Sequence, residues 1–183
     1  MAQHMHSRSN KRALTTKEIV IFAMLGSILF ISKILMEWAP NIHFIGMLLM
    51  TYTLVYRKKA LIPLYVFVLL EGVYVGFNLW WIPYVYIWLP LWGVTMLLPK
   101  NMPVKVAIPV YMVVCALGGL TYGTVYAPFQ ALAFGLSFKG MLTWIAAGLP
   151  FDILHGAGNL AAGALIYPLS RLIINIETRS NIR

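Results

Sequence analysis

Apolar segments long enough to cross a lipid bilayer dominate this sequence and limit the folds open to it. A membrane-spanning helix needs roughly 20 consecutive, mostly apolar residues. The chain has 183 residues, of which 61% are hydrophobic and only 10% are charged. A soluble domain usually carries about a quarter of charged residues. We therefore expect an all-helical integral membrane protein with a single membrane domain.

Turn residues and charges divide the apolar sequence into six predicted spans. Thr15 or Thr16 can cap the first helix, because Glu18 follows in its first turn, where an acidic side chain suits the helix dipole. Prolines and the basic run at 57–59 mark later boundaries. The expected spans cover approximately residues 16–35, 43–56, 60–77, 82–98, 104–126 and 141–176, the last with a break at Pro150.

These spans form one predicted domain at residues 17–177, between a basic tail at 1–16 and a short tail at 178–183. The first residues of the chain resemble an expression-derived leader, so His4 and His6 are given no functional role. Both tails are expected to be cytoplasmic, because of the distribution of Lys and Arg along the chain.

The basic residues predict the orientation, because cytoplasmic connections of membrane proteins are enriched in Lys and Arg. Lys33 and Lys139 are the exceptions to a pattern in which alternate connections carry the positive charge. An even number of spans then places both termini in the cytoplasm, and the protein is expected to be a multi-pass membrane protein. The net charge of +9 follows from this placement and does not indicate nucleic-acid binding. The basic residues of the cytoplasmic set are Arg8, Lys11, Arg12, Lys17, Arg57, Lys58, Lys59, Lys100, Lys105, Arg171, Arg179 and Arg183.

Residues 71–88 combine three of the six tryptophans with Glu71 and Asn78. Aromatic rings gather at membrane interfaces, so a belt at one bilayer face is one interpretation. A carboxylate within an apolar segment is costly unless it faces a cavity, a ligand or a counter-ion. Glu71 and Asn78 therefore favour the wall of a binding pocket, and Lys33 is the candidate ion-pair partner of Glu71.

Asp152, His155 and Asn159 are spaced by three and four residues, so one face of the last predicted helix carries all three. Polar side chains of an apolar helix point into a bundle or a cavity. They form either a buried polar network or part of a ligand site. Two candidate metal ligands without a cysteine cluster give little support to a metal site, and we expect none. Hydrolase and phosphate-loop motifs are absent from the sequence, although an intramembrane enzyme that uses Asp152 and His155 remains an alternative.

The first predicted helix carries small residues at Ala23, Gly26 and Ser27. Small side chains let a second helix approach closely. The partner helix is either internal or belongs to another subunit.

With these features the chain resembles the substrate-binding S components of energy-coupling factor (ECF) vitamin transporters. The resemblance covers most of residues 15–177, and it rests on the size, the six spans, the pattern at 23–27 and the Asp152, His155 and Asn159 helix. It implies that Ala23, Gly26 and Ser27 contact a transmembrane coupling subunit, which works with two separate ATPase subunits. The chain itself would then be a transport subunit and no enzyme, without a cofactor of its own, and the resemblance implies a multi-pass protein of a prokaryotic cytoplasmic membrane.

The resemblance also implies a vitamin site near the external face, beneath the connection between the first two spans. The runs at 41–43, 78–83 and 150–152 look most like the cobalamin-type group, so cobalamin or a related corrinoid is the favoured ligand. Folate, riboflavin and a queuosine precursor are the alternatives. The expected ligand contacts are Trp38, His43, Glu71, Asn78, Trp80, Trp81, Tyr84, Tyr86 and Asn159.

Overall fold

The computed structural model describes residues 13–39 and 41–181, and all regular elements in these two stretches are helices. The predicted all-helical class is confirmed for this part of the chain. The elements are α1 (Thr16–Leu35), α2 (Ile45–Tyr56), η1 (Arg57–Ala60), α3 (Leu61–Val75), η2 (Ile82–Val85), α4 (Leu89–Leu97), α5 (Val104–Leu120), α6 (Tyr122–Phe134), α7 (Phe138–Gly163) and α8 (Ile166–Asn181), where η denotes a 3₁₀-helix.

The first helix begins as the sequence predicts. Thr15 caps it, because its hydroxyl oxygen accepts the Glu18 backbone N–H at 3.2 Å. The Thr15 backbone N–H in turn donates to the Glu18 carboxylate at 3.0 Å. This reciprocal pair is a capping box, which satisfies two backbone donors at once.

Two helical stretches are long and apolar enough to cross a membrane, namely α1 and the nearly continuous α5–α6 stretch of 31 residues. A third candidate exists if α7 and α8, which are bent by 48° at residues 164–165, are counted as one broken span. The other helices within the described residues are shorter. The structure is thus compatible with a membrane protein.

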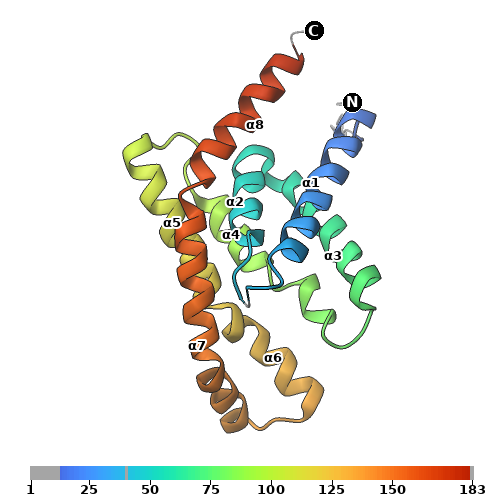
Figure 1. Ribbon diagram of the computed structural model, residues 1–183, viewed down its shortest axis with the longest axis vertical. Helices are drawn as coiled ribbons and strands as arrows, with labels where there is room; N and C mark the ends of the chain where they lie inside the picture. The colour runs from blue at the N-terminus through green and yellow to red at the C-terminus, as the bar shows by residue number, and fades with distance from the viewer. Residues whose placement is uncertain (1–12, 40, 182–183) are drawn as a thin grey trace, which may run out of the picture.

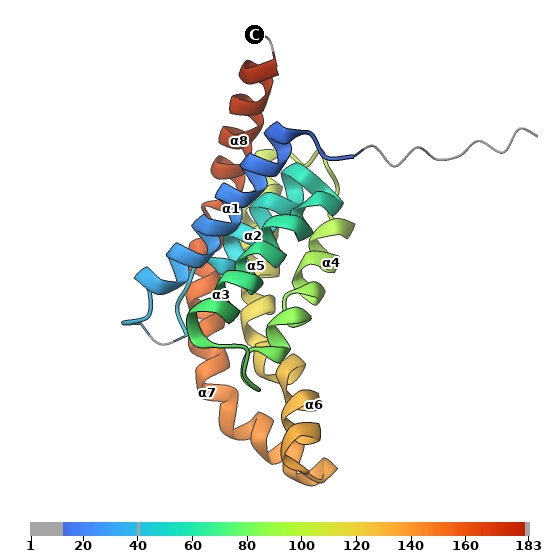
Figure 2. The ribbon, with the colours of Figure 1, turned by 90° about the vertical axis from the view of Figure 1, so that its right-hand side faces the viewer.

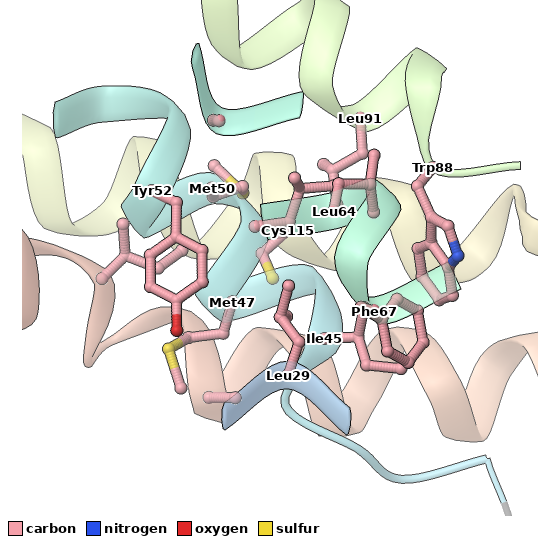
Figure 3. Packing of buried hydrophobic residues seen from close by; sticks show 14 of the residues in the cluster. Leu29, Ile45, Met47, Met50, Tyr52, Leu64, Phe67, Trp88, Leu91 and Cys115 are labelled. Carbon is pink, nitrogen blue, oxygen red and sulfur yellow. The ribbon is translucent and has the colours of Figure 1, made fainter. Parts of the chain in front are cut away.

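Two pairs of helices make the most extensive contacts in the described part of the chain. α1 lies along α3, and α5 lies along α7 (Figure 1). Both contacts need glycine, since a Cβ added at Gly26 would lie 2.6 Å from the Val66 side chain, and one at Gly119 would lie 2.8 Å from the Gly156 backbone. α2 lies between the pairs and contributes much of the buried core, with Ile45, Met47, Met50 and Tyr52 beside Leu64, Phe67, Trp88 and Leu91 (Figure 3).

The beginning of α1 and the last turns of α8 lie at the same end of the molecule (Figures 1 and 2). Lys17 Nζ donates to Ser180 Oγ at 2.8 Å, and the Tyr56 hydroxyl donates to Glu177 Oε1 at 3.0 Å. An ion pair between Lys59 and Glu18 lies beside them. We call this the basic end, because many of the Lys and Arg residues that the topology argument grouped together lie on the elements that meet here.

Three of the expected spans differ from the structure. The fourth, expected at residues 82–98, is divided into the 3₁₀-helix η2 and the nine-residue helix α4. The fifth apolar segment, expected to end near Tyr126, stays helical to Phe134, with Pro128 inside α6. Pro150 likewise lies within α7, and the break comes instead at residues 164–165. Each proline removes only one backbone donor, a loss that membrane helices tolerate. As a result, α6 and the first half of α7 form a hairpin that projects away from the basic end (Figure 2).

Candidate functional site

Two adjoining cavities lie beneath the connection at residues 36–44, which joins α1 to α2. Their volumes are about 210 and 350 Å³, and both are lined by Asn41, Tyr84 and Tyr122. Asn41 has a positive φ of 60°, a conformation that asparagine adopts more readily than most residues. We call them the polar cavity and the aromatic cavity.

The polar cavity is lined by ionisable and imidazole side chains at the end of α1. Lys33, Glu37 and His43 come from α1 and the connection, and His155 comes from α7. The His43 and His155 rings stand edge to face with centroids 4.5 Å apart. Tyr122 also meets the His155 ring, at a centroid distance of 5.2 Å. This arrangement joins the 36–44 connection to α6 and α7 through aromatic contacts.

The aromatic cavity is enclosed mainly by rings and contains one carboxylate. Tyr126 and Trp144 stack with centroids 5.8 Å apart and an angle of 20° between their planes. The rings that line it are Trp80, Tyr84, Tyr122, Tyr126, Trp144 and Phe151, and the carboxylate is that of Asp152.

Asp152 is held by a close contact between α6 and α7. Its Oδ1 accepts the Gly123 backbone N–H at 3.1 Å, and its side chain is buried. A Cβ at position 123 would lie only 2.5 Å from Oδ2, so this contact requires glycine. Within residues 13–39 and 41–181, no basic group lies within ion-pair distance of Asp152, and Oδ2 has no hydrogen-bond donor. A buried carboxylate without a counter-ion favours a cation or a strong hydrogen-bond donor in the cavity.

Asp152, His155 and Asn159 share the buried face of α7, in accordance with their spacing, and none is more than 6% exposed. They do not hydrogen-bond to one another in the structure. Asn159 Nδ2 instead donates to the Cys115 carbonyl at 3.3 Å. Among the described residues, His155 Nε2 and Asn159 Oδ1 have no hydrogen-bond partner. His155 and Asn159 also line a small space of about 20 Å³ behind the polar cavity, next to Trp88.

The other predicted contacts divide into two groups. Trp80, Tyr84 and His43 line the cavities. Glu71 is an ion-pair partner of Lys33, with Oε1 2.5 Å from Nζ, as the sequence suggested.

The remaining four serve local structure or lie apart from the cavities. Asn78 Oδ1 accepts the backbone N–H groups of Trp80 and Trp81 and so stabilises the turn after α3. Trp81 Nε1 donates to the Val68 carbonyl at 2.7 Å, and the Tyr86 hydroxyl donates to the Val125 carbonyl at 3.3 Å. Trp38 is 79% exposed and lines neither cavity.

Several cavity residues were not among the expected ligand contacts. Tyr122 and Tyr126 are spaced by four residues, as are Trp144 and Gly148, and Trp144 and Asp152 are eight residues apart. Such spacings place residues on one helix face. The combination of this aromatic face with Asp152 was the available signal in the sequence.

The predicted coupling residues on α1 point in different directions. Gly26 is buried against α3, close to Val66 and Pro63. Ala23 is exposed and Ser27 is partly exposed, with the Ser27 hydroxyl donating to the Ala23 carbonyl at 3.0 Å. Exposed Met24 and Ile28 flank them and extend an uncovered apolar face.

The part of the chain that the structure describes contains no group of three or more side chains suited to bind a metal ion. Comparisons with protein-family models, curated proteins and solved structures found no match for this chain. The functional conclusion therefore rests on the site itself.

Proposed function

We propose that this protein is the substrate-binding membrane subunit of an ECF-type importer for a vitamin or a vitamin precursor. The observation that carries the proposal is the aromatic cavity, which is lined by rings and by the Asp152 carboxylate, a group without a counter-ion among the described residues. Small-molecule sites typically combine apolar and aromatic walls with a few polar groups that fix orientation. The two adjoining cavities have this composition.

The ligand should have a flat, polarisable face and an N–H donor or a positive charge directed at Asp152. Aromatic rings attract cations through their π faces, and a carboxylate strengthens that preference. A corrinoid remains the favoured ligand on the resemblance of the sequence, with folate, riboflavin and a queuosine precursor as alternatives. A corrin with its side chains is larger than either cavity, so binding it requires the 36–44 connection to move outward.

The proposal includes partners and an orientation. Ala23 and Ser27, with the uncovered apolar face around them, would contact a transmembrane coupling subunit, and two ATPase subunits would supply the energy. Both chain ends would be cytoplasmic in a prokaryotic plasma membrane. The basic end supports this orientation, because lysines and arginines favour the cytoplasmic side. The candidate ligand cavities then open toward the opposite face.

Calorimetric titration of the purified protein in detergent tests the ligand class. Cobalamin, cobinamide, folate, riboflavin and a queuosine precursor are titrated separately, and we expect one-to-one binding of one ligand or of the two corrinoids. If the folded protein binds none of the five ligands, the proposed ligand class is wrong. Recovery of a chemically altered ligand after long incubation would favour the intramembrane enzyme instead.

A variant of Asp152 tests the site. Asp152→Asn removes the charge but keeps the shape and the acceptor for Gly123, so a ligand that donates to this carboxylate should bind about 10 to 100 times more weakly, the range expected for a charge-assisted hydrogen bond. Glu177→Gln, at the basic end, is the matched control. Unchanged affinity of Asp152→Asn would place the ligand elsewhere.

A further inference from the structure

A third cavity of about 350 Å³ lies at the basic end, between the segment 100–103, the end of α2 and the first turns of α8. It is separate in its residues from the polar and aromatic cavities. Its polar lining consists of Lys100, Asn101, Tyr111, Tyr167, Ser170 and Arg171. We call it the basic cavity.

The charges in the basic cavity have one sign. Lys100 and Arg171 line it, and no carboxylate does. Among the described residues, neither cation has a hydrogen bond or an ion pair. Tyr111 and Ser170 are each only 5% exposed and come from α5 and α8, so the wall behind the cations belongs to the packed core. An anion that enters would meet these two cations, the phenols of Tyr111 and Tyr167 and the amide of Asn101, whereas the Ser170 hydroxyl already donates to the Tyr167 carbonyl at 2.8 Å.

The start of α5 adds to this positive field. α5 begins at Val104, directly after the lining residue Pro103, and no side chain caps it. The N-terminus of a helix carries a partial positive charge, which favours anions and above all phosphate.

The rest of the lining is apolar and includes Leu54, Met102 and Ile174. A site for a free, hydrated anion has no need of these side chains, whereas a lipid presents a phosphate and an acyl chain side by side. The cavity also lies at the basic end. Lys58 and Lys105 are exposed to solvent and are close in sequence to residues that line the cavity. Basic pockets between membrane helices on the cytoplasmic side are suited to anionic lipid headgroups.

We propose that the basic cavity binds the phosphate of an anionic phospholipid, with Lys100 and Arg171 as the phosphate ligands and the apolar residues against its acyl chain. Tyr111, Tyr167 and Asn101 supply the neutral polar groups around the headgroup. The site fixes α8 to the membrane surface where it bends away from α7. This proposal is independent of the ligand proposed for the aromatic cavity.

The experiment is native mass spectrometry of the full chain, released from micelles that contain phosphatidylglycerol or phosphatidylcholine with identical acyl chains. Wild-type protein should retain one phosphatidylglycerol molecule in preference to phosphatidylcholine. The double variant Lys100→Gln/Arg171→Gln should lose at least tenfold in apparent affinity, because two charge-assisted phosphate contacts disappear. Lys58→Gln/Lys105→Gln removes the same charge at the same end but outside the cavity, and it should retain the lipid.

Three results would overturn the proposal. Equal retention of both lipids by the wild type would show that the cavity does not select the net negative charge of an anionic headgroup. Equal losses in the two double variants would show that only the overall charge matters. Displacement of the lipid by millimolar inorganic phosphate would assign the cavity to a free anion. If the double variant fails to fold, Lys100→Gln alone decides, because Lys100 is exposed and its replacement leaves the core intact.

Discussion

The ion pair between Lys33 and Glu71 offers the most direct test of how α1 is held on α3. Lys33 Nζ lies 2.5 Å from Glu71 Oε1, and the Glu71 side chain is 3% exposed. Glu71 Oε2 has no hydrogen-bond partner among the described residues, so the lysine is the main compensation for this buried charge. Removal of one member of a buried pair typically costs about 3–5 kcal/mol, because the other charge is left uncompensated.

For Lys33→Met we expect the unfolding free energy to fall by about 3–5 kcal/mol. Glu71→Leu should cost somewhat less, about 3 kcal/mol, because Glu37 lies 3.8 Å from Lys33 and still faces its charge. For a chain of this size, 3 kcal/mol corresponds to a decrease in the melting temperature of about 6–12 °C. The double variant Lys33→Met/Glu71→Leu replaces the pair by apolar groups and should come within about 1 kcal/mol of the wild type.

The chain carries its own reporter for this measurement. Cys115 is the only cysteine in the sequence and is fully buried, so a thiol-reactive fluorogenic dye labels the protein only as it unfolds. Glu37→Gln is the matched control. Its carboxylate is 47% exposed and lies farther from Lys33, so its loss should cost less than about 1 kcal/mol. Strict additivity of the two single losses in the double variant would refute the coupling.

Two further perturbations test the α5–α7 contact and the proposed coupling face of α1. Gly119→Ala should destabilise the protein by about 2 kcal/mol or more, because the new methyl group would lie 2.8 Å from the α7 backbone. The thiol-labelling assay measures this loss of stability. Gly93→Ala is the control and should be neutral or stabilising, because a Cβ at this position meets nothing within 4 Å. Ala23→Leu/Ser27→Leu should leave ligand binding intact but abolish uptake in cells that contain the proposed partners, whereas loss of binding itself would show that this face is internal packing.

Local rules predicted the features whose causes are local. The capping box of α1 needs only Thr15 and Glu18, which are three residues apart. The shared face of Asp152, His155 and Asn159 follows from the helical period alone. The pairing of Glu71 with Lys33 could also be foreseen, because an isolated carboxylate in an apolar segment needs a cation and few were available.

The sequence alone could not distinguish which aromatic residues at 71–88 line a cavity and which stabilise the local structure. Trp81 and Tyr86 donate to backbone carbonyls 13 and 39 residues away in the chain, and their orientation depends on contacts between distant elements. The aromatic cavity depends on the same kind of long-range packing, because α6 and α7 supply Tyr126 and Trp144 to one stacked pair. The length of α6 was missed because Pro128 commonly ends a helix but here lies within one.

The position of the two cavities has a consequence for ligand entry. One wall of the cavities comes from α1, the connection after it and residues 80–84, and the other wall comes from α6 and α7. The cavities therefore lie along a seam, that is, along the interface between these two groups of elements. The contacts that bridge this seam include the His43–His155 ring pair and the hydrogen bond from Tyr86 to Val125. A clamshell-like opening along this seam would admit a large ligand while every helix kept its own backbone hydrogen bonds. Tyr86→Phe removes the hydrogen bond to Val125 and should therefore speed ligand exchange, although Tyr86 lines neither cavity.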